Sequence, residues 1–190
     1  MKRKSILTLM LGLIMSSTAL LADNPFFKEF DTPFGAPPFD KIKIEHYLPA
    51  FEKGIKESEE DIAKIINNKK AADFQNTIEA LEQRGATLSR VSNVFFNLTS
   101  SNTNDQMMEI QKKVTPMITK LSDDIYLNDK LFARVKAVYD NNQKSSKLNA
   151  EQKKLLEVYY KEFASNGALL SASDKDKLRD INTKLSNATL

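Results

Sequence analysis

Side chains that could do chemistry are few in this sequence. Its 190 residues contain one histidine, His46, and no cysteine. This excludes zinc sites made from cysteines or from several histidines, iron–sulfur clusters and cysteine nucleophiles. Glu45 beside His46 could form a partial metal pair, but a lone histidine near a helix start is more often structural. Glycine-rich phosphate-binding patterns are missing. The sequence therefore predicts no catalytic, cofactor-binding or metal-binding residue.

Carboxylates and tyrosines form the other candidate groups. The acidic runs Glu59-Glu60-Asp61 and Asp123-Asp124 are expected on solvated helix faces, because adjacent residues of a helix point in different directions. Residues 37–40 and 92–100 look like functional stretches, yet they contain no combination of side chains that could carry out a reaction. The tyrosines are expected in the core or in the wall of a groove rather than at a catalytic centre: Tyr47, Tyr126, Tyr139, Tyr159 and Tyr160.

The first 22 residues are typical of a secretory signal peptide. Basic residues 2–4 precede an apolar stretch over 6–15, and small residues then lead to Ala22, after which cleavage is expected. The apolar stretch is shorter than the roughly 20 residues that a membrane-spanning helix needs. No cysteine follows it, which excludes a lipoprotein anchor. The sequence thus predicts a periplasmic or secreted protein with no membrane attachment after cleavage.

The net charge of +3 belongs to this same segment. The segment holds three of the 28 basic residues and none of the 25 acidic ones, so the mature chain is neutral. An overall basic footprint for phosphate backbones is absent. Nucleic acid is therefore not an expected partner.

The rest of the chain must position any functional surface, and its pattern predicts an all-α fold. Residues 23–43 form an arm rich in proline and phenylalanine, which cannot be helical and whose phenylalanines should pin it onto a folded body. From residue 44 to 190 the apolar residues recur at helical spacing. Helices are expected in the segments 44–67, 74–98, 103–121, 128–139, 149–167 and 173–190.

Several local signals refine these helices. Residues 103–106 fit a capping box before the third helix, and Pro116 should kink or break that helix. Asn149 should precede the fifth helix, and Gly167 should end it. The apolar stripe of the sixth helix runs to the end of the sequence. We therefore expect this helix to be cut off and to need further protein to pack against.

Five stretches in order resemble the thimet oligopeptidase family, and in particular its peptidyl-dipeptidase (Dcp) branch. They span the mature chain and occupy residues 37–52, 74–82, 94–98, 128–135 and 174–182. The Phe-Phe-Asn-Leu run at 95–98 favours that branch over oligopeptidase A. The resemblance implies the N-terminal helical portion of a longer, clam-shaped zinc peptidase, in which this portion forms one wall of a channel for short peptides.

In that family the zinc-binding His-Glu-x-x-His helix and a later glutamate lie in the C-terminal half, which has no counterpart in this sequence. The resemblance thus implies zinc for the full-length family member, none bound by this chain, and no activity of the chain alone. Its implied partners are short oligopeptides and the missing C-terminal catalytic region. A stand-alone helical binding module is the alternative. A helical repeat adaptor is disfavoured because no fixed period recurs.

Overall fold

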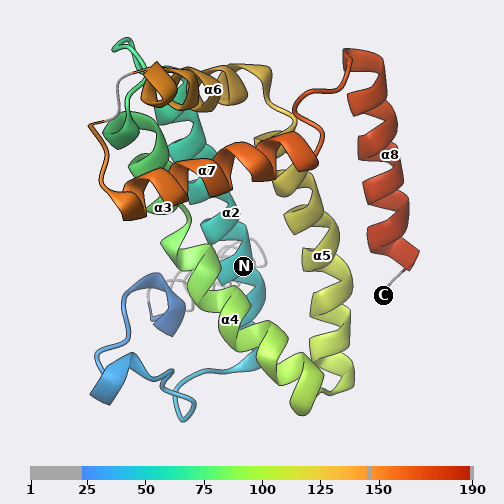
Figure 1. Ribbon diagram of the computed structural model, residues 1–190. Helices are drawn as coiled ribbons and strands as arrows, with labels where there is room; N and C mark the ends of the chain where they lie inside the picture. The colour runs from blue at the N-terminus through green and yellow to red at the C-terminus, as the bar shows by residue number, and fades with distance from the viewer. Residues whose placement is uncertain (1–22, 145–146, 189–190) are drawn as a thin grey trace, which may run out of the picture.

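The computed structural model of the protein describes residues 23–144 and 147–188. The expected signal peptide lies outside these ranges. Within them every regular element is helical and there is no strand, which confirms the all-α class (Figure 1). None of the helices in these ranges is both long enough and apolar enough to cross a bilayer.

The elements follow one another with short connections. η1 and η2 are 3₁₀ turns of the arm, and η3 is a π-helical segment. In chain order they are η1 (Pro25–Phe27), η2 (Pro33–Gly35), α2 (Ile44–Ile66), η3 (Phe74–Glu79), α3 (Ala80–Glu82), α4 (Ala86–Ser101), α5 (Asp105–Tyr126), α6 (Asp129–Lys144), α7 (Ala150–Ser165) and α8 (Ala172–Ala188).

The long helix α2 is the centre of the arrangement. It packs against α4 and α5 along its length, and α6 and α7 pack against each other over one end. α8 packs mainly against α5 and stands at the outer edge of the molecule (Figure 1). This placement leaves one long side of α8 without a neighbouring helix.

The prediction of a single helix over 74–98 is wrong, because the helix is interrupted within this range. η3 runs directly into α3, which ends at Glu82, and Gly85 adopts a left-handed backbone with φ +67° before α4 begins. A glycine accepts this conformation without a side-chain clash. Leu81 and Leu88 lie seven residues apart across the turn, so the helical spacing continues although the helix does not.

The other helix boundaries agree closely with the signals in the sequence. Asn149 caps α7, accepting from the Gln152 N–H at 2.9 Å and donating back to its side chain at 3.1 Å. Gly167 follows α7 with φ +96°. The capping box expected over 103–106 is wrong, because the N-cap of α5 is Asn104, whose side chain accepts from the N–H of Met107. α5 continues through Pro116, so the expected break is wrong.

Two apolar clusters form the interior. The first lies where α2, α5, α6 and α7 meet and is centred on Leu131, Leu156 and Phe163. The second lies between the start of α2, α4 and the arm, and it includes Phe51 and Phe95, whose rings meet edge to face at 5.3 Å. Leu88 and Ile118 pack against both clusters. They join the two clusters into one body.

The arm is held onto this body by its first residues. Phe26 is fully buried against Tyr47, with ring centroids 5.4 Å apart. Its carbonyl accepts from Arg90 Nη1 at 2.6 Å. Phe34 and Phe39 are exposed, so the expectation that the arm's phenylalanines pin it is wrong for these two. They lie on the stretch of the arm where η2 turns away from the helices.

Candidate functional site

His46 is a structural residue at the start of α2. Its buried ring accepts a hydrogen bond at Nδ1 from the backbone N–H of Lys43, 3.0 Å away. Its carbonyl accepts from the side-chain amide of Asn24 at 2.8 Å. The histidine therefore closes the helix N-terminus and ties the arm to it, as expected for a lone histidine at this position.

A charged cleft of about 540 Å³ opens beside His46, between the arm and α2. Its wall mixes carboxylates such as Asp31 and Asp40 with the ammonium groups of Lys28 and Lys41. Among the described residues, no three histidine, aspartate or glutamate side chains are grouped so as to hold a metal ion. The donor set at this cleft thus does not fit a zinc ion, and we assign no metal-dependent step to it.

The tyrosines lie in the interior, as expected. Tyr159 donates from its hydroxyl to Glu82 Oε2 at 2.7 Å, which joins α7 to α3. Burial, followed by this hydrogen bond to the carboxylate, raises the pKa of the Tyr159 phenol well above its ordinary value. Burial also raises the pKa of Tyr126, which donates to Glu162 at 3.3 Å. These phenols remain protonated hydrogen-bond donors and not nucleophiles.

The stretch 92–100 lies on α4 and is structural. Val94 and Phe95 are buried in the second cluster. The Ser100 hydroxyl donates to the carbonyl of Phe96 at 2.8 Å, and Ser101 donates to that of Asn97 at 2.7 Å. The hydroxyls at this helix end are thus occupied by their own backbone.

The two acidic runs have different surroundings. Glu59 and Glu60 are exposed, as expected. The solvated position expected for this run is wrong for Asp123, which is only 7% exposed, whereas the side chain of Asp124 is 38% exposed. Asp123 accepts from the Asn182 side-chain amide at 2.6 Å. α8 covers this side of α5, and such a contact between residues 59 positions apart is invisible to the local sequence pattern.

A polar stripe of α8 faces α5 and the first residue of α6. Lys175 is buried and contacts Asp129, while Arg179 Nη1 donates to Asp124 at 2.8 Å. Together with Asn182 these residues recur every three or four positions, so they share one face of the helix. α8 is therefore attached through ion pairs and hydrogen bonds on a face that the sequence analysis did not identify.

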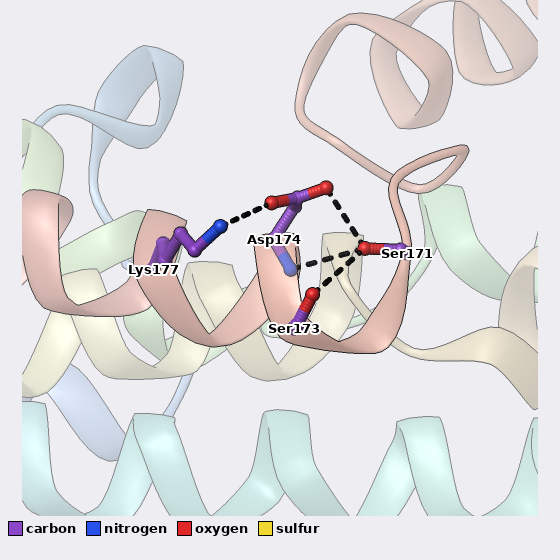
Figure 2. Close-up of polar contacts among 4 residues, drawn as sticks. All are labelled: Ser171, Ser173, Asp174 and Lys177. Carbon is purple, nitrogen blue, oxygen red and sulfur yellow. Dashed lines mark hydrogen bonds and ion pairs between the residues drawn. The ribbon is translucent and has the colours of Figure 1, made fainter.

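The start of α8 is fixed by a compact set of polar contacts (Figure 2). The Ser171 hydroxyl accepts from the N–H of Asp174 at 3.2 Å and donates to its carboxylate at 2.8 Å. Lys177 pairs with the other carboxylate oxygen at 2.8 Å, and Ser173 lies 3.1 Å from Ser171. These contacts lower the pKa of Asp174, the ion pair most strongly. The cluster is a helix cap, since all its groups are used within the first turn.

Large apolar side chains are exposed beside this cap. Leu169 and Leu170 on the connection before α8 are 64% and 43% exposed, and Ile181 and Leu185 on α8 are 58% and 59% exposed. On the described surface these residues form the main concentration of exposed leucine and isoleucine side chains. The feature with the clearest functional meaning is therefore an apolar surface and not a reactive centre.

Comparison with known proteins supplies close relatives. The chain is 42% identical over 166 residues to "Dipeptidyl carboxypeptidase" of Escherichia coli strain K12, a match covering 87% of this chain and 24% of that protein. The protein of the same name from Salmonella typhimurium strain LT2 is 42% identical over 170 residues, covering 90% and 25% respectively. "Oligopeptidase A" of Escherichia coli is 24% identical over 155 residues, covering 82% and 23%. No family model matches.

The chain is much shorter than these relatives. The chain spans about a quarter of the length of the curated relatives that it matches. The matches nevertheless cover more than four fifths of this chain.

Proposed function

Because the chain is related to the bacterial dipeptidyl carboxypeptidases and, more distantly, to oligopeptidase A, we propose that it is the N-terminal helical region of a longer zinc peptidase. In this proposal the complete enzyme releases C-terminal dipeptides from oligopeptides. The observation that carries it is the 42% identity over most of the chain, combined with coverage of about a quarter of the relative.

Within that enzyme the chain acts as a scaffold. Two joined apolar clusters and a tied-down arm make the helices one body, which suits a fixed wall of a peptide channel. The donors beside His46 do not fit zinc. The zinc ion, which would activate a water molecule for hydrolysis, belongs in this proposal to residues outside the chain.

We also propose that the enzyme is exported to the periplasm or secreted. The basic, apolar and small-residue pattern of residues 1–22 supports this. A fusion of residues 1–30 to a phosphatase that is active only outside the cytoplasm should show activity. The same fusion with two charged residues inside the apolar stretch should not, and equal activity of both fusions would contradict export.

A chimeric enzyme tests the peptidase assignment. Residues 23–190 would replace the matched quarter of the Escherichia coli dipeptidyl carboxypeptidase, and release of dipeptides from an oligopeptide would be measured with zinc present. The chimera should be active, whereas the chain alone and the host without this quarter should not. A well-folded chimera that releases no dipeptide would contradict the assignment and favour a stand-alone binding module.

A further inference from the structure

The two long sides of α8 are unusual in the side chains that they bury and expose. Arg179 and Asn182 face α5 and Lys175 contacts Asp129 of α6, while Ile181 is 58% exposed. At about 100° of rotation per residue, Ile181 lies roughly 130° around the helix from the centre of that polar stripe. A helix at the edge of a soluble body normally buries its apolar side and exposes its polar side. α8 departs from this pattern by burying Lys175 and exposing Ile181.

The apolar side of α8 continues into the connection before it. A Cβ atom built on Gly167 would lie 2.7 Å from Leu178 Cδ2 and 3.1 Å from Leu170 Cδ1, so these two leucines meet at the same corner. Leu178 in turn precedes Ile181 by three residues and shares its side of the helix. The exposed side chains of Leu169, Leu170 and Ile181, with the half-buried Leu178 between them in the sequence, are called here the outer patch.

We propose that the outer patch is the docking surface for the part of the peptidase polypeptide that lies outside this chain. The inference rests on the proposed function. Its occupant is an apolar surface, because burying an isoleucine and three leucines stabilises a contact only when no charged group must be desolvated in exchange.

Two observations favour this occupant. The relatives are about four times as long as the matched region, so a large amount of polypeptide must pack somewhere against these helices. The polar stripe of α8 is already occupied by α5, and the two apolar clusters are closed by the arm and by α6 and α7. The outer patch therefore offers the exposed apolar area that such packing requires.

Single cysteines provide the test, since the chain has none of its own. Ile181→Cys would be placed in the chain alone and in the chimera, whose host cysteines are replaced by serine. Its rate of reaction with a maleimide is then measured. The control is Thr183→Cys, an exposed position on the opposite side of α8. In the chimera Cys at 181 should react at least about tenfold more slowly than Cys at 183, since a covered thiol reacts only after local opening.

The outcomes separate the inference from the proposed function. In the chain alone both thiols should react at similar rates. Equal rates for both thiols in an active chimera would overturn the docking surface while leaving the peptidase assignment intact. Protection of position 181 in the chain alone, together with a dimer in sedimentation, would assign the patch to a second copy and would also overturn it. An inactive, folded chimera would overturn both.

Discussion

The carboxylate of Asp123 is a buried negative charge whose partner lies on another helix. Asn182 donates to it at 2.6 Å across the contact between α5 and α8. A buried charged acceptor that loses its donor retains the full penalty of its desolvation. The Asn182 side chain therefore contributes strongly to holding α8 against α5.

We expect Asn182→Ala to weaken the attachment of α8 by about 1–3 kcal/mol. Hydrogen exchange of the α8 amides should accelerate by roughly 5- to 150-fold, while the amides of α2 and α4 stay unchanged. Asn187→Ala, an exposed change on the same helix, is the control and should have little effect. Identical exchange in both variants would show that the Asp123 contact does not hold α8.

Tyr159 gives the protein a dependence on alkaline pH. Its pKa is raised from an ordinary value of 10.0 by burial and by the bond to Glu82. As the pH rises above about 10, the unfolded chain therefore loses this proton before the folded one does, and the free energy of unfolding must fall. In Tyr159→Phe that contribution disappears. Urea unfolding at pH 7, 10 and 11 should show a shallower decline for the variant, and equal declines would refute the assignment.

The arm contributes to stability through one of its phenylalanines and not through another. Phe26→Ala should lower the free energy of unfolding by about 3–5 kcal/mol, because it leaves a cavity beside Tyr47 in the second cluster. Phe34→Ala removes the same atoms from a fully exposed position. This variant should change the free energy of unfolding by less than about 0.5 kcal/mol. Urea denaturation compares the two, and similar losses would mean that the arm is not anchored as described.

The helices themselves followed from the sequence where the signal was local. Apolar spacing identified each long helix, and Asn149 and Gly167 marked the two ends of α7 because caps act within one turn. The break at Gly85 was missed because Leu81 and Leu88 keep helical spacing across it. The burial of Asp123 was missed because it depends on Asn182, far along the chain. Periodicity identifies which residues of a helix are apolar, but not which of its sides meets a neighbour.

The two apolar clusters meet at a narrow point between α2 and α4. Gly54 of α2 lies so close to α4 that a Cβ atom built on it would fall 2.6 Å from the backbone nitrogen of Leu88. Leu88 packs against both clusters. The absence of a side chain at position 54 thus sets the separation of α2 and α4, on which both clusters depend.

Gly54→Ala should therefore destabilise the protein although alanine is the better helix former. The added methyl group meets backbone and not a flexible side chain, so α2 and α4 must separate, at a cost of about 1–3 kcal/mol. Lys56→Ala, an exposed change in the same helix, should be nearly neutral. Thermal unfolding followed by circular dichroism measures both. A higher melting temperature for Gly54→Ala would show that the close approach of the helices is not required.

The attachment of α8 also has a distinctive thermodynamic character. Detaching it would uncover the polar groups of Asp123, Asp124, Arg179 and Asn182. Exposure of polar surface lowers the heat capacity, whereas exposure of apolar surface raises it. The two clusters weaken on cooling because their stabilisation is hydrophobic, but the contact between α5 and α8 does not share that dependence. In the cold, α8 stays attached while the interior that it borders loses strength.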